Sequence, residues 1–137
     1  MAGRKTKTIT ITDEGRDKGK VYSLTELPAS KAERWAMRAF FAMMRGGVTV
    51  PDDLAAMGMA GLAQMGLSAV SSMSFHDAEP LLDEMMTCVK AVPDPTKPSF
   101  VRELVETDIE EVKTRLLLRK EVFTLHTDFF TSASPSA

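Results

Sequence analysis

The segment KTKTITITDEGRDKGKVYSLTEL, residues 5–27, carries the clearest strand pattern in the chain. Thr alternates with Lys or Ile over residues 5–12, and β-forming side chains recur over residues 20–26, so each run predicts a strand with one half-buried face. The DEGRDKG between them supplies turn residues, and we expect a β-hairpin with a mobile, charged loop. Because two strands alone are marginally stable, the hairpin must pack against helices.

A helix is predicted to follow the hairpin, from Ser30 to about Arg45. Ser30 and Glu33 have the spacing of a capping box, and two glycines after Arg45 are typical of a helix end. Bulky apolar residues can face inward from this helix, with Trp35 as a core anchor. Basic residues form a separate stripe along it: Lys31, Arg34, Arg38 and Arg45.

Three more helices are predicted downstream. One begins at Pro51, and another is capped by Ser74 or Asp77 and carries an apolar stripe as far as Val92. The proline-rich PDPTKP ends that helix, and SFVRELVE after it should be extended or a short strand. The longest helix starts at the capping box TDIE, residues 107–110, and runs to about His126.

These elements predict a mainly α fold with an N-terminal β-hairpin (α+β), with about four helices in one small domain. The domain should cover residues 1–130, with the hairpin at about residues 5–26. The small, polar residues 131–137 should form a disordered tail.

A charge-free run, LAAMGMAGLAQMGLSAVSSMSF at residues 54–75, allows three interpretations. A membrane span is disfavoured, because the flanks are acidic and the run contains several glycines and serines. A buried central helix is favoured, since the run is apolar on all sides. The third interpretation is a partner-binding face, because flexible methionines adapt to varied surfaces. Its residues would be Met57, Met59 and Met65.

The last helix has apolar residues on two nearly opposite faces. One face contains Ile109, Val112, Leu116 and Phe123. The other contains Leu118, Val122, Leu125 and Phe129. A helix on a single core needs one such face, so either the helix bends or ends early, or one face binds another chain. We favour the second face, beginning at Leu118, as a partner-binding surface.

Composition and motifs favour a non-enzymatic protein without cofactors. The 17 basic and 19 acidic residues nearly balance, which disfavours a polybasic nucleic-acid binder. The lone Cys88 has no partner for an internal disulfide, and no apolar signal-peptide region follows the N-terminus. His76 and His126 lie in no metal-binding spacing, and no phosphate-binding or nucleophile motif occurs, so we expect neither a metal site nor a catalytic site.

Three segments of the sequence resemble bacteriophage tail assembly chaperones: EGRDKGKVYSLTELPASKAERWAMRA, DAEPLLDEMM and VETDIEEVKTRLLLRKEVFTLH. The resemblance covers residues 8–126. It implies a non-enzymatic protein of the host bacterial cytoplasm, from a long-tailed phage or prophage. Such a protein would bind the tape-measure protein, help recruit the tail-tube protein, and self-associate as a homo-oligomer. It would bind no nucleic acid and no membrane.

Two other functions remain open. One is a permanent structural protein of a phage tail or head-tail junction, which purified virions would contain. The other is a small regulator whose basic stripe binds nucleic acid in a salt-sensitive manner.

Overall fold

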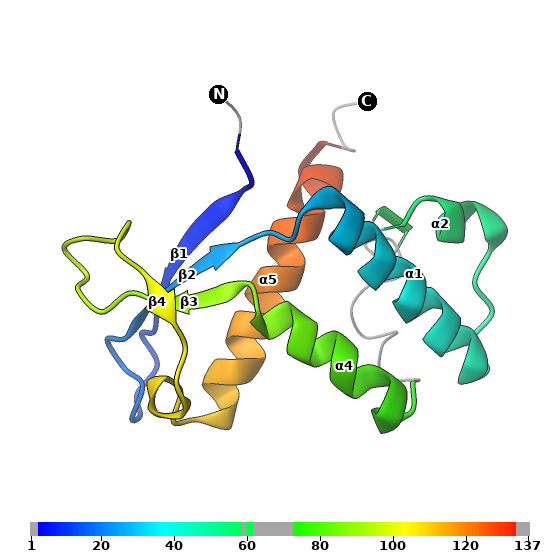
Figure 1. Ribbon diagram of the computed structural model, residues 1–137. Helices are drawn as coiled ribbons and strands as arrows, with labels where there is room; N and C mark the ends of the chain where they lie inside the picture. Colours follow the sequence, from blue (N-terminus) through cyan, green and yellow to red (C-terminus); the bar gives the residue numbers. More distant parts are fainter. Residues whose placement is uncertain (1–2, 59, 62–72, 134–137) are drawn as a thin grey trace. The chain divides into compact units, whose positions relative to one another are not determined.

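The predicted hairpin is present, and it forms half of a larger sheet. The computed structural model describes residues 3–58, 60–61 and 73–133. Strand β1 (Thr6–Thr10) pairs antiparallel with β2 (Val21–Thr25), β2 with β3 (Val89–Ala91), and β3 with β4 (Arg102–Glu103) (Figure 1). The expectation of a mainly helical fold with a hairpin alone is therefore wrong, because two later segments extend the hairpin to four strands.

The number of helices also differs from the expected four. Three helices of twelve or more residues lie in the described part of the chain: α1 (Ala29–Arg45), α4 (Phe75–Met86) and α5 (Val112–Ala133). The helix predicted to begin at Pro51 is present as α2 (Asp52–Ala56), and residues 59 and 62–72 of the run after it lie outside the described residues. Residues 131–133 of the expected disordered tail belong to α5, and residues 134–137 lie outside the described residues.

The helix that was expected to reach Val92 ends at Met86, because the apolar residues after Met86 belong to the sheet. Leu24 faces Val89 across the β2–β3 pair, and the Val92 amide donates to the Val21 carbonyl at 3.0 Å. A β-branched side chain such as Val89 fits a strand better than a helix. The apolar residues after α4 therefore pair with β2, and the prediction of a short strand within SFVRELVE is confirmed by β4.

The chain divides into two compact units, each built from separated segments. The first contains residues 1–26 and 85–125, and the second contains residues 27–84 and 126–137. α5 begins in the first unit and ends in the second.

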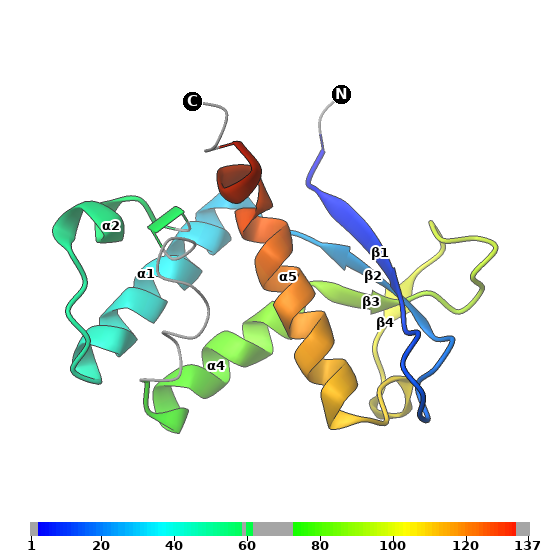
Figure 2. The ribbon, with the colours of Figure 1, turned by 180° about the vertical axis from the view of Figure 1, so that it is seen from behind.

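In the first unit, the initial part of α5 lies along the sheet (Figures 1 and 2). Lys7 of β1 forms a 2.9 Å ion pair with Glu121 of α5. Cross-strand partners share a face, so Lys7, Leu24 and Val89 point to the same side of the sheet. The largest fully buried apolar side chains of this unit are Tyr22, Leu24, Leu118 and Val122.

The second unit is organised by contacts between α1 and α4. The buried Trp35 indole donates to the Leu81 carbonyl at 2.9 Å, which confirms Trp35 as a core residue. An ion pair of Arg45 with Asp77 at 2.9 Å adds a second link. The buried residues of α1 are Trp35, Ala36, Ala39, Phe40, Ala42 and Met43.

The two predicted capping boxes do not form as expected. Pro28 occupies the N-cap position of α1, so Ser30 lies inside the first turn and caps nothing. At the second box, residues 106–108 form a short 3-10 helix and α5 begins only at Val112. In contrast, Ser74 does cap α4, with its hydroxyl accepting from the Asp77 amide at 3.2 Å.

Much of the charge-free run, including Met59 and Met65, lies outside the described residues. Within residues 3–58, 60–61 and 73–133, no helix is both long enough and apolar enough to cross a membrane.

Candidate functional site

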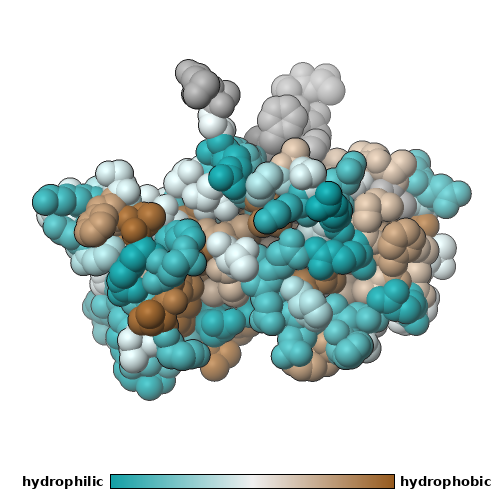
Figure 3. Space-filling model, viewed as in Figure 1, coloured by the Kyte–Doolittle hydropathy of each residue, from teal (hydrophilic) through white to brown (hydrophobic). Residues whose placement is uncertain are grey.

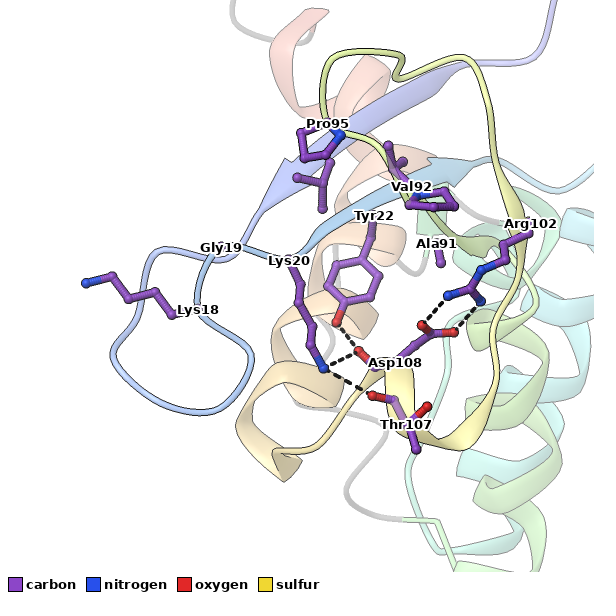
Figure 4. Close-up of a pocket in the computed structure, with 12 residues that line it drawn as sticks. Lys18, Gly19, Lys20, Tyr22, Ala91, Val92, Pro95, Arg102, Thr107 and Asp108 are labelled. Atoms are coloured by element: carbon purple, nitrogen blue, oxygen red, sulfur yellow. Dashed lines mark hydrogen bonds and ion pairs between the residues drawn. The ribbon is translucent and has the colours of Figure 1, made fainter.

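A pocket of about 440 Å³ opens at one end of the sheet in the first unit (Figure 4). Its apolar wall comes from β2, β3 and the proline-containing loop after β3: Val21, Tyr22, Ala91, Val92, Pro93 and Pro95. Its polar rim contains Lys18, Lys20, Arg102, Thr107 and Asp108. The pocket therefore combines an apolar wall with a rim that is rich in cations.

Tyr22 and Lys20 fasten the segment around Asp108 to the sheet. The Tyr22 hydroxyl donates to the Asp108 backbone carbonyl at 2.5 Å. The Lys20 ammonium donates to the carbonyls of Thr107 and Asp108 at 3.1 and 3.2 Å. Burial raises the pKa of Tyr22 to about 12, and the nearby carboxylates of Asp17 and Asp108 add to this shift. Tyr22 therefore stays protonated and remains a donor at neutral pH.

Arg102 and Asp108 form a two-pronged ion pair at the other side of the rim. The guanidinium donates from both terminal nitrogens to the two carboxylate oxygens, each at 2.8 Å. This arrangement lowers the pKa of the Asp108 carboxyl below its usual range. The Asp108 carboxylate also accepts a hydrogen bond from the Val105 amide at 2.7 Å, and this bond stabilises the turn of the chain before α5.

Asp17 lies behind this rim and holds the hairpin loop against the start of α5. Its side chain is only 1% exposed, and it accepts hydrogen bonds from the amides of Glu110, at 2.9 and 3.1 Å, and Glu111, at 2.9 Å. It also forms a 2.9 Å ion pair with Lys20. Burial alone would raise the pKa of Asp17, but these hydrogen bonds, with the Glu110 amide foremost, hold it well below the usual range. Asp17 therefore joins the hairpin loop to the two residues that precede α5.

The polar groups around this pocket are bonded to the chain itself. The Tyr22 pKa is raised to about 12 and the Asp108 pKa is lowered, so at neutral pH Tyr22 donates a hydrogen bond and Asp108 carries a negative charge. The Lys20 and Arg102 cations are already engaged with oxygens of the chain itself. In the part of the chain that the structure describes, no three His, Cys, Asp or Glu side chains gather in a group that could hold a metal ion.

Most of the predicted partner-binding residues on α5 are buried. Leu118 and Val122 are 0% exposed and Leu125 is 8% exposed, so these three residues belong to the chain's own core. Their prediction as a binding surface is therefore corrected. The side chain of Phe129 lies outside the described residues.

The face of α5 that had been expected in the core contains the exposed residues instead. Val112 is 74% exposed and Leu116 is 57% exposed, whereas Phe123 is buried. Both faces were apolar in the sequence, and only the packing against the sheet decides between them. At the start of α5, the face that was expected in the core is therefore the exposed one.

Exposed apolar side chains also occur in the second unit. Phe41 and Met44 on α1 are 51% and 41% exposed, and Phe75 at the start of α4 is 71% exposed. Met57, one of the predicted partner-binding methionines, is 44% exposed; Met59 and Met65 lie outside the described residues. Apolar surface is visible in the space-filling view over α1 and α2 (Figure 3).

On α1, the exposed apolar residues lie beside the basic stripe. At 100° per residue, Met44 and Phe41 lie between the buried face and a sector that contains Lys31, Arg34, Arg38 and Arg45. Two of these cations are paired, Arg38 with Glu84 and Arg45 with Asp77. Lys31 and Arg34 are exposed. The outer side of α1 therefore presents an apolar strip with a positive border.

No family model, no curated protein and no solved structure matches this chain.

Proposed function

We propose that this chain is a non-enzymatic tail assembly chaperone of a long-tailed phage or prophage, acting in the host bacterial cytoplasm. Its client would be the tape-measure protein, and it would help to recruit the tail-tube protein. The proposal is supported by the three sequence segments that resemble tail assembly chaperones. The structural observation that carries it is the exposed apolar strip of Phe41 and Met44 on α1.

Two features make this strip suitable for holding a client helix. Phe41 and Met44 are three residues apart, so they lie together on one side of α1. α1 is held to α4 by the Trp35–Leu81 hydrogen bond and by ion pairs, which keeps the strip in place without a client. An amphipathic client helix could cover the strip with its own apolar side, in the manner of other helix-binding proteins.

The positive border predicts the chemistry of the client segment. Lys31 and Arg34 would lie beside a bound helix, so acidic residues flanking the client's apolar side would complement them. Because these cations are exposed, they should contribute to selectivity and association rate more than to affinity.

The test is co-expression with the tape-measure protein, followed by co-purification. The parent should keep the client soluble and bound, whereas Phe41→Ser with Met44→Ser should weaken binding at least tenfold while leaving the fold intact, because both side chains are exposed. The matched control is Val112→Ser with Leu116→Ser, which alters two exposed apolar residues of α5. If the α1 variant still binds the client, or if the control loses as much binding as the α1 variant, the strip is not the client-binding surface.

A further inference from the structure

We propose that two copies of this chain pair through the free edge of β1, forming one continuous sheet. β1 is the first strand in the sheet order, so only one of its edges is paired among the described residues (Figure 2). All its residues are exposed except Ile9, which is half-buried. Its pairing with β2 is continuous and contains neither a bulge nor a proline. Its one charged side chain, Lys7, which would oppose edge pairing, is ion-paired with Glu121 at 2.9 Å. This interface does not depend on the proposed client.

The direction of the backbone groups follows from the pairing with β2. The Ile11 amide donates to the Lys20 carbonyl at 2.9 Å, and the Glu26 amide donates to the Lys5 carbonyl at 3.0 Å. Because hydrogen-bonded residues alternate along an antiparallel strand, the odd-numbered residues of β1 direct their backbone groups to β2. The even-numbered residues direct theirs away from the sheet: Thr6, Thr8 and Thr10.

The sequence of β1 complements itself in one antiparallel register. With Thr8 opposite Thr8 of the second copy, Thr6 lies opposite Thr10 and all three outward-facing threonines find a partner. Each such pair exchanges two backbone hydrogen bonds, about six in all. Lys7 then lies opposite Ile9, so the two Lys7 residues are diagonal and not directly opposite each other.

The neighbouring registers are less favourable. A shift that places Thr6 opposite Thr8 sets Lys7 against Lys7 of the second copy, where the charges repel. The opposite shift, with Thr8 opposite Thr10, leaves Thr6 without a partner inside β1. The register centred on Thr8 is therefore preferred on both charge and hydrogen bonding.

Such pairing stops at two copies. The outer edges of the combined sheet would both be β4, which has only two residues. An edge this short gives little template for another strand. The symmetric contact uses the same edge of both copies, so it closes as a dimer and does not continue as a fibre.

Sedimentation measurements over a range of concentrations test the proposal, together with two substitutions at Thr8. Thr8→Pro removes the outward amide from each copy and thus two of the hydrogen bonds, so the dissociation constant should rise roughly ten- to hundredfold. Thr8→Val keeps the amide and the β-branched shape and should remain dimeric. A parent that is monomeric at every concentration, or a folded Thr8→Pro variant that dimerises like the parent, would overturn the proposal.

A crosslink provides the second measurement and decides the matter if Thr8→Pro fails to fold. Thr8→Cys should form a disulfide between copies under mild oxidation, because the proposed register places the two positions directly opposite each other. Thr25→Cys, on the interior strand β2, should not, and the native Cys88 is buried. Equal crosslinking at both positions, or none at Thr8, would overturn the proposed register and interface.

Discussion

Replacing Asp17 by Asn should destabilise the attachment of the hairpin loop to α5. The carboxylate is 1% exposed and accepts from two backbone amides, Glu110 and Glu111, while pairing with Lys20. The carboxamide of Asn has one acceptor oxygen where Asp has two. At the Oδ2 position that oxygen can still accept from both amides, but the NH2 group then replaces the Oδ1 that accepted from the Glu110 amide and paired with Lys20. The Lys20 ammonium then faces a donor and loses its counter-charge. An unsatisfied buried donor and a lost charge-assisted hydrogen bond together cost about 2 to 4 kcal/mol.

Urea unfolding followed by circular dichroism measures this cost. The control is Asp13→Asn, an exposed position in the same loop, which should change the free energy of unfolding by less than about 0.5 kcal/mol. Hydrogen exchange of the Glu110 and Glu111 amides should also accelerate in the Asp17 variant. A free energy of unfolding equal to that of the control would refute the role assigned to Asp17.

The same substitution has a predicted pH dependence. The folded-state pKa of Asp17 is depressed, so its stabilising effect is fully present above the unfolded pKa of about 4 and is lost as the pH falls. The difference in stability between parent and Asn variant should therefore be largest near neutral pH and shrink in acid. A difference that stays constant from neutral pH into strong acid would contradict the electrostatic part of the explanation.

Two further predictions concern single aromatic residues. Tyr22 is the only tyrosine, so the phenolate absorbance of the folded protein should titrate at about 12, against about 10 for the chain unfolded in denaturant; coincident titrations would contradict its burial. Trp35→Phe should lower the free energy of unfolding by about 1 to 3 kcal/mol, because it removes the indole hydrogen bond to the buried Leu81 carbonyl and part of a buried aromatic side chain; an unchanged urea midpoint would show that this hydrogen bond is unimportant.

The elements that depend on local signals were predictable from the sequence. The alternation of Thr with Lys and Ile identified β1, and the periodic apolar residues around Trp35 identified both the extent and the buried face of α1. In each case, the interactions that define the element lie within a short stretch of chain.

The elements that depend on distant partners were not predictable. Val89 and Val92 fit the apolar stripe of a helix as well as a strand, and only the presence of β2 selects the strand. The backbone amides that bind Asp17 belong to residues more than ninety positions away, so the turn-like sequence around Asp17 did not predict a buried carboxylate. A loop rich in acidic and basic residues has the same sequence pattern whether those residues are solvated or buried.

The candidate site shows the same limitation. The sequence revealed surplus apolar residues on α5 but gave no means of choosing between its two faces, and the structure buries Leu118 and Val122 while exposing Val112 and Leu116. The exposed strip on α1 was missed because a single inward-facing set satisfied the helical pattern. Counting the apolar residues left outside that set would have identified Phe41 and Met44 as candidates.

The proposed chaperone, unlike a permanent structural protein, should be present during tail assembly and missing from the virion, which quantitative mass spectrometry can test on one infected or induced culture. Tail intermediates that contain the tape-measure protein and finished virions would be purified separately, and the amount of this chain per tape-measure protein would be compared between them. The account predicts that the chain is abundant in the intermediates and absent from the virions. A similar amount in both would contradict it and establish a permanent structural protein instead.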